Sequence, residues 1–301
     1  MSAAIDPARA LAEYQRLRPR LPACDTQGAG RVAARFLDIV APYELILFDA
    51  YGVLNVGETA IDGAAQTIAA LRDMGKSVMV VSNSAAYPKA HMMDRYANLG
   101  FDFTLDEVVT SREALLHHVA QEPTRHWGVM LNPDKDMGEI ADLGATVLAD
   151  DLAVYDRAEG FLLVGADGWT GARQTLLEAS LARHPRPVFV GNPDLVAPRE
   201  DGLSLEPGWF AHGLIDATGA SVHFCGKPFP DIFDLALARC SAIDPARVLM
   251  VGDTLHTDIL GSAQAGFATA LVTGHGSLLG LDVSAAIKDS GIAPDYIVSK
   301  I

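Results

Sequence analysis

Short apolar runs that alternate with amphipathic helical segments constrain the fold of this chain more than any other feature. The helical segments between the runs commonly end at a glycine, such as Gly75, Gly100 or Gly266. A strand that is apolar on both faces must be covered on both faces, as in a parallel sheet with helices on each side. The alternation therefore predicts an α/β fold with a central parallel sheet. The expected strands are residues 45–49, 78–82, 107–110, 222–226, 248–252 and 269–273.

Residues 120–218 interrupt this alternation and have a character of their own. They contain the apolar runs "WGVML", "GFLLVG" and "PVFVG", a helical stretch at 171–183, and the loop-like segment "GNPDLVAPREDGLSLEPG". We interpret them as a separate α/β domain inserted into the first one. Residues 41–119 and 219–301 would then form one discontinuous core domain.

The first forty residues precede this core and are predicted to form a helical extension, residues 1–40. Asp6 and Pro7 are typical of a helix start, and the spacing of apolar residues predicts an amphipathic helix over 6–17. A second helix is expected over 30–40.

The composition excludes some partners and leaves others open. The net charge is −15, from 38 acidic and 23 basic residues, which argues against nucleic acid or an anionic membrane, since both need a basic surface. A phosphorylated substrate needs only local positive charge. The three cysteines form no CxxC pair, and we find neither a signal-peptide pattern nor an apolar run of membrane-spanning length, so we expect a soluble cytoplasmic protein. The oligomeric state stays open, a homodimer included.

Polar side chains stand at the ends of four expected strands. They are Asp49, Ser82 with Asn83, Lys227, and Asp253. Ligands bind at the carboxyl ends of the strands in an open parallel sheet, so we expect these side chains to meet. Any one of the others, taken alone, is typical of a helix cap or a solvated loop. Asp49 is the exception, because an unpaired charge behind a buried apolar run is costly.

This set of residues points to phosphoryl chemistry. A carboxylate such as Asp49 can act as a nucleophile and carry a phosphoryl group. Asp49 and Asp253, together with a main-chain carbonyl, can hold Mg²⁺, which prefers hard oxygen ligands. Asp258 can orient a water molecule that is bound to the metal, without contacting the metal itself. Lys227 can neutralise the charge of a phosphate, and the Ser82 hydroxyl can donate to its oxygens.

Four motifs resemble those of the haloacid dehalogenase (HAD) superfamily. They are "DAYGVL" (49–54), "SN" (82–83), "GKP" (226–228) and "GDTLHTDILGSAQAG" (252–266). The last motif, and the long insertion between the second and third, resemble class IIA, the branch that is similar to sugar and nucleotide phosphatases. The resemblance covers about residues 41–300. It implies a HAD-like Rossmannoid core, an inserted α/β cap domain, and hydrolysis of a small phosphorylated metabolite with Mg²⁺ as cofactor.

The resemblance also implies a role for each motif residue. Asp49 would be the nucleophile and a metal ligand, and the main-chain carbonyl of Tyr51 a second ligand. Asp253 would be the other direct ligand, and Asp258 would support it. The groups that bind the phosphate or line its site would be Ser82, Asn83, Lys227 and the amide of Gly52.

Tyr51 departs from the phosphatase pattern, in which a second Asp serves as general acid and base. A phenol ionises only near pH 10, which makes it a poor base at neutral pH. "DAYG" is similar to the opening of the 2-haloacid dehalogenases, which need no such acid but also no metal-binding Asp253 and Asp258. We favour the phosphatase, because the fourth motif matches more positions and no Lys or Arg follows Asp49 before Arg72. A third alternative is a phosphometabolite-binding protein with weakened catalysis.

Other residues carry weaker signals. His117 and His118 lie in a helical stretch with no Cys or third ligand nearby, so a surface pair is favoured over a zinc site. His256 lies inside the fourth motif, and both substrate contact and a solvated loop position remain open. For Trp169 and Trp209 we favour packing in the core of the inserted domain over a cover for the substrate.

Overall fold

The computed structural model describes residues 5–24, 27–200, 202–240 and 242–301, and its larger sheet confirms the predicted α/β fold. Seven strands lie in this sheet, and every pair of neighbours is parallel. In spatial order they are β1 (Arg31–Val32), β16 (Tyr296–Val298), β15 (Ala268–Val272), β14 (Val248–Gly252), β2 (Leu45–Phe48), β5 (Ser77–Ser82) and β6 (Val108–Thr110). We call this part of the molecule the core lobe.

Helices cover the core sheet on both faces, because its central strands are apolar on both. Ile46 and Phe48 of β2 pack on one face with residues of α2 and α3, while Leu45 and Leu47 pack on the other with residues of α4 and α8. The helices of the core lobe are α2 (Ala64–Asp73), α3 (Lys89–Asn98), α4 (Ser111–Val119), α8 (Pro230–Ala238), α9 (Leu260–Gln264) and α10 (Val283–Ser290).

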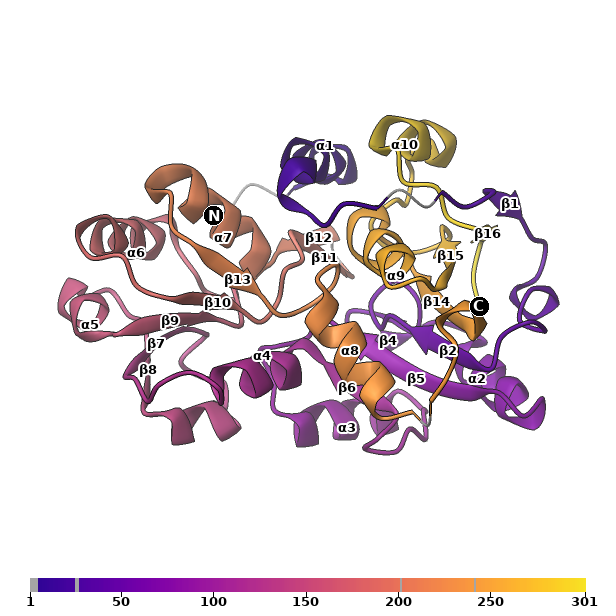
Figure 1. Cartoon of the computed structure of the whole chain (residues 1–301), viewed down its shortest axis with the longest axis horizontal. Coiled ribbons are helices and arrows are strands. Elements are labelled where there is room, and N and C mark those ends of the chain that lie inside the picture. Colours follow the sequence, from indigo (N-terminus) through magenta and orange to yellow (C-terminus); the bar gives the residue numbers. More distant parts are fainter. Residues whose placement is uncertain (1–4, 25–26, 201, 241) are drawn as a thin grey trace.

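Residues 127–224 form a second lobe, here called the insert lobe, beside the first (Figure 1). Its five-stranded sheet is also parallel throughout. The strand order is β13 (Val222–Phe224), β10 (Val188–Val190), β9 (Gly160–Leu163), β7 (Trp127–Met130) and β8 (Ala145–Val147). Its helices are α5 (Leu152–Arg157), α6 (Gly171–Arg183) and α7 (Pro207–Thr218).

Two short hairpins lie outside both sheets. One joins β3 (Asn55–Val56) to β4 (Thr59–Ala60), directly after the first motif. The other joins β11 (Val196–Arg199) to β12 (Gly202–Leu205). The second lies within the Pro- and Gly-rich segment that we expected to be a loop. The two strands pair at four positions, so their main-chain N–H and C=O groups bond to each other. The composition of the segment did not reveal this pairing.

Two further expectations about the core are wrong. Residues 30–40 form no α-helix but contribute β1 and a short 3₁₀ turn, Phe36–Asp38, because their main chain pairs with β16 instead. The run at 222–226, expected in the core sheet, contributes β13 to the insert lobe. If the chain is divided according to the sheet that each strand joins, the inserted part ends after Phe224 rather than at residue 218.

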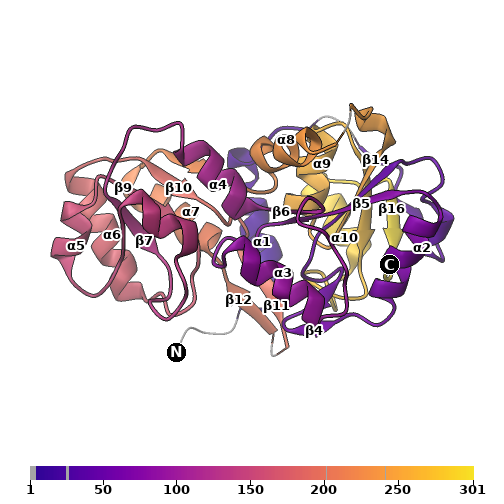
Figure 2. The same cartoon turned by 90° about the horizontal axis from the view of Figure 1, so that it is seen from below.

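The helix expected over 6–17 is confirmed as α1 (Pro7–Leu17), and the side chain of Asp6 caps it. α1 lies over the junction of the two lobes (Figures 1 and 2). Tyr14 packs with Leu195 and Val196 beside the β11–β12 hairpin. Among the described residues, no helix has both the length and the apolar character that a bilayer span requires.

Candidate active site

The carboxyl ends of β2, β5 and β14 lie side by side and bring three of the predicted residues together. Asp49 follows β2, Ser82 ends β5, and Asp253 follows β14; β14 and β5 pair with β2 on either side. All three line or border a small cavity of about 60 Å³ between the lobes, which also contacts Asn83 and Tyr51. The expectation that these strand ends converge is therefore confirmed.

Lys227 links two of the carboxylates although it follows a strand of the other sheet. Its Nζ donates to Asp49 Oδ1 at 2.7 Å and lies 2.7 Å from Asp258 Oδ1. The second contact is an ion pair without hydrogen-bond alignment. Burial acts to lower the pKa of Lys227, but the charges of Asp258 and Asp49 outweigh it and raise that pKa. The ammonium group is therefore charged although the side chain is buried.

Asn83 holds Lys227 in place rather than only lining the cavity. Its Oδ1 accepts from the main-chain N–H of Lys227 at 2.8 Å, and its Nδ2 donates to the carbonyl of the same residue at 2.9 Å. The same Nδ2 donates to Asp194 Oδ1 at 2.8 Å. Asp194 comes from the "GNPD" segment of the insert lobe, so this amide ties both lobes to the lysine.

The fourth motif folds into a tight turn around its own carboxylates. Asp258 Oδ2 accepts from the N–H groups of Asp253 and Thr254, both at 3.1 Å. Asp253 Oδ2 accepts from the N–H of Ser277 at 2.6 Å. Asp258 thus shapes the turn on which Asp253 stands.

Burial and nearby negative charge raise the pKa values of Asp49 and Asp253. Burial, opposed by Lys227, raises the pKa of Asp49 to about 6. Burial, together with the charges of Asp258 and Asp49, raises the pKa of Asp253 to about 8. Candidate donor oxygens of Asp49, Asp253 and Asp258 all lie within 4.8 Å of one another. Ionising all three carboxylates beside a single ammonium group would leave an excess of negative charge, which a divalent cation with a preference for hard ligands would offset.

Gly52 contributes through a close approach instead of through its amide. Its φ is +81°, and a Cβ there would lie 2.8 Å from Asp253 Cγ. Its N–H donates to the carbonyl of Asn55 at 2.8 Å. The expected phosphate contact of this amide is therefore not available, because the turn that brings Gly52 against Asp253 already uses the donor.

The side chain of Tyr51 lies among two arginines from distant segments. Arg95 Nη1 donates to the Tyr51 hydroxyl at 2.7 Å. The guanidinium carbons of Arg95 and Arg199 lie 4.7 Å and 5.0 Å from the centre of the Tyr51 ring. Arg95 is also paired with Glu58. Cations thus reach the first motif from α3 and β11, so the absence of Lys and Arg just after Asp49 carried no information about the site.

His256 faces away from the cavity. It is buried and stacks on Tyr14 of α1, with ring centres 5.1 Å apart. Burial, helped by Arg18, lowers its pKa to about 3. His256 is therefore neither a solvated loop residue nor a charged proton donor at neutral pH.

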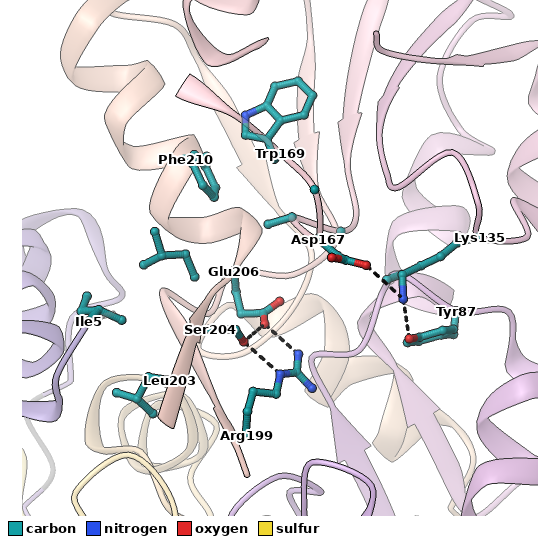
Figure 3. A pocket seen from close by; sticks show the side chains of 15 residues that line it. Ile5, Tyr87, Lys135, Asp167, Trp169, Arg199, Leu203, Ser204, Glu206 and Phe210 are labelled. Carbon is teal, nitrogen blue, oxygen red and sulfur yellow. Dashed lines mark hydrogen bonds and ion pairs between the residues drawn. The ribbon is translucent and has the colours of Figure 1, made fainter. Parts of the chain in front are cut away.

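A wider cleft of about 480 Å³ continues from the small cavity into the insert lobe (Figure 3). Trp169 and Phe210 form an aromatic wall of this cleft, and both also pack against the apolar core of the insert lobe, the position favoured for Trp169 from the sequence. Lys135 lies 3.8 Å from Asp167, and Arg199 pairs with Glu206 at 2.9 Å. A molecule that reaches from Asp49 into this cleft would meet an aromatic wall and two ion pairs.

Sequence reasoning missed Asp194, Arg95, Arg199 and Lys135 at this site. Asp194 lies in a quoted motif, and its position before a strand could have marked it. Arg95 lies in the last turn of α3, where basic residues are common, and Arg199 lies in a segment that we expected to be a loop, so neither residue gave a signal of its own. They enter the site only through the packing of α3 and of the hairpin.

Comparisons with known proteins agree with this geometry. Residues 46–146 match the family described as haloacid dehalogenase-like hydrolase, and residues 224–301 match a family described as HAD-hydrolase-like. Chronophin from Bos taurus is 30% identical over 290 residues, covering 89% of this chain and 94% of that protein. An acid sugar phosphatase from Staphylococcus haemolyticus is 28% identical, covering 84% and 92%. The crystal structure of a possible sugar phosphatase of the HAD superfamily from Cytophaga hutchinsonii aligns with a TM-score of 0.76 at 25% identity, covering 90% and 98%.

Proposed function

The chain belongs to the haloacid dehalogenase-like hydrolases, and from this premise we propose that it is a Mg²⁺-dependent phosphatase of small phosphorylated metabolites. The observation that carries the proposal is the contact of Lys227 with Asp49 and Asp258, beside Asp253. One carboxylate there can attack phosphorus while an ammonium group and a bound cation offset the charge of the phosphate. Two relatives are described as sugar phosphatases, which supports the same reaction class.

In the proposed reaction Asp49 acts as nucleophile and is regenerated. Its free oxygen forms a bond to phosphorus as the bond to the alcohol oxygen breaks, and the departing oxygen takes up a proton. Water then hydrolyses the aspartyl-phosphate, which returns the carboxylate and releases inorganic phosphate and a proton. Lys227 holds the other oxygen of Asp49 at 2.7 Å and so orients the attacking one. The Ser82 hydroxyl is the proposed donor to a phosphate oxygen.

Asp49, Asp253 and the main-chain carbonyl of Tyr51 are the proposed ligands of Mg²⁺. The donor chemistry fits, because Mg²⁺ takes one or two carboxylates and keeps several waters. When bound, the ion would withdraw charge from the phosphate oxygens. Asp258 is the proposed supporting residue, because its Oδ2 accepts from the main-chain N–H groups of Asp253 and Thr254 and so shapes the turn that carries Asp253.

Tyr51 supports a second candidate, a protein that binds a phosphorylated metabolite but turns it over slowly. Its hydroxyl accepts from Arg95 and no carboxylate stands at this position. A 2-haloacid dehalogenase is a third candidate, since Arg95 and Arg199 could receive a substrate carboxylate. That reaction would leave Asp253 and Asp258 without a role. Phosphate release from a panel of phosphomonoesters, measured with Mg²⁺ and with a chelator, separates the phosphatase from the metabolite-binding protein. Halide release from a chloroacid in the presence of a chelator tests the dehalogenase.

We predict unequal effects of two substitutions on Mg²⁺ affinity. Asp253→Ala removes a direct ligand and is expected to weaken binding more than about 100-fold, whereas Asp258→Ala removes a supporting group and should cost about 10- to 100-fold. Calorimetric titration with Mg²⁺ measures both. The exposed Asp73→Asn on α2 serves as a control that changes net charge without touching the site. Equal losses for the two site variants would contradict the assignment of their roles.

The same acids predict that Mg²⁺ stabilises the fold more at higher pH. The pKa of Asp253 is raised to about 8, whereas an unfolded chain ionises its Asp near pH 3.9. Between these values the unfolded state releases a proton that the folded state keeps, so stability without metal falls as pH rises through this window. Bound Mg²⁺ favours the ionised form and removes this loss. The rise in Tm on adding Mg²⁺ should be larger at about pH 8 than at about pH 5, and Asp253→Asn should abolish the difference. Equal rises at both pH values would contradict it.

A further inference from the structure

A second group of metal-ligating side chains lies outside the site around Asp49. His118 on α4, His223 on β13 and Asp231 on α8 each offer one donor atom, and these atoms lie within 4.8 Å of one another. His223 and Asp231, the two candidate ligands beside His118, lie more than a hundred residues farther along the chain, so the sequence around His118 did not reveal them. The expectation that the adjacent histidines form only a surface pair is therefore incomplete for His118.

The distances among the donors suit a tetrahedral ion. Asp231 Oδ2 lies 2.8 Å from His223 Nε2 and 3.8 Å from His118 Nδ1. Ligands of zinc stand about 2.0–2.2 Å from the ion, which puts neighbouring tetrahedral donors about 3.3–3.5 Å apart. The 2.8 Å separation is a direct hydrogen bond and is shorter than that value, whereas the 3.8 Å separation is longer, so a bound ion would replace the hydrogen bond. The two nitrogens lie within 4.8 Å of each other, so the three donors have to draw together to share one ion.

The two imidazole rings stack on each other and lie near the ring of Phe189, and both side chains are partly exposed to solvent. The rings of His118 and His223 stack with centres 4.0 Å apart, and Phe189 lies 5.2 Å and 5.7 Å from them. The side chains of His118, His223 and Asp231 are 34%, 41% and 27% exposed. The two rings are stacked in this structure, so each would have to turn about its broad χ2 torsion for both lone pairs to meet at a shared ion. The partial exposure leaves room for water as a fourth ligand.

We propose that His118, His223 and Asp231 bind a borderline transition-metal dication of the Zn²⁺ class. Two imidazoles and one carboxylate suit Zn²⁺, whereas the all-carboxylate set around Asp49 suits Mg²⁺. The ligands stand on both connections between the lobes: α4 precedes the entry into the insert lobe, and β13 precedes the return. A bound ion therefore ties these two connections to α8 of the core lobe.

Calorimetric titration with Zn²⁺ of the full chain, in an excess of Mg²⁺ that fills the carboxylate site, tests the proposal. One Zn²⁺ per chain is expected. His118→Gln and His223→Gln should each weaken binding at least about tenfold, as even the loss of a supporting group does at metal sites. The matched control is His117→Gln, which removes the exposed neighbour on the same helix and should leave the affinity unchanged.

Co²⁺ absorption provides a second readout that depends on geometry. The wild type should show the visible band of tetrahedral Co²⁺ with nitrogen ligands, Zn²⁺ should displace it, and His118→Gln and His223→Gln should lose it. Thermal unfolding in chelator checks that each variant is folded. Zn²⁺ binding that persists in both variants, or that is lost in Asp253→Asn, would overturn the proposal. Because Mg²⁺ is present and phosphatase activity is not the readout, this outcome is independent of the proposed function.

Discussion

Asp49→Asn is expected to abolish phosphate release, with kcat lowered by at least about 10⁴-fold, as when the nucleophile of a covalent mechanism is removed. The amide that replaces the carboxylate cannot attack phosphorus, and it also loses the negative charge that a cation would contact. The measurement is phosphate release from an activated aryl phosphate with Mg²⁺, followed long enough to detect a residual rate.

The fold should tolerate this substitution. Burial raises the pKa of Asp49 to about 6, so a neutral group at this position relieves a desolvation cost. Lys227 keeps Asp258 as its partner. Thermal unfolding should therefore show a native transition in Asp49→Asn, and the exposed Asp73→Asn should retain full activity. Substantial hydrolysis by folded Asp49→Asn would refute the role of Asp49 as nucleophile.

Tyr51 is expected to make the rate depend strongly on the leaving group. An aryl phosphate departs without a proton, whereas an alkyl phosphate needs a general acid, whose help is worth about 10²- to 10⁴-fold. The wild type should therefore hydrolyse an aryl phosphate far faster than an alkyl phosphate. An initial burst with slower turnover is expected, because breakdown of the aspartyl-phosphate also lacks a base.

Two substitutions of Tyr51 separate the possible roles of its hydroxyl. Tyr51→Asp should raise the ratio of the alkyl phosphate hydrolysis rate to the aryl phosphate hydrolysis rate. Arg95 lies 2.7 Å from the present hydroxyl and would favour the ionised form of the introduced carboxylate, which opposes its action as an acid. Tyr51→Phe keeps the ring between Arg95 and Arg199 and should leave the ratio unchanged. A wild type already fast on alkyl phosphates, together with a selective loss in Tyr51→Phe, would show that the phenol itself donates the proton.

Local sequence patterns were enough to predict five adjacent strands of the core sheet and the acids at its edge, but not β1 and β16 at the other side of the sheet. The strand over residues 45–49 is recognised because its side chains are apolar on both faces, and Asp49 is the residue at which that pattern ends. The same argument applies to Ser82 and Asp253. Since neighbouring parallel strands end at the same edge, the convergence of these residues follows from the strand pattern alone.

The tertiary structure decided which distant segments reach that edge. Lys227 follows a strand of the other sheet, and Arg95 and Arg199 reach Tyr51 from a helix and a hairpin. His256 lies inside a recognised motif but turns toward Tyr14. A strand or helix pattern states which face of its own element is apolar. It does not state which element will cover that face, because that choice depends on packing between segments far apart in the chain.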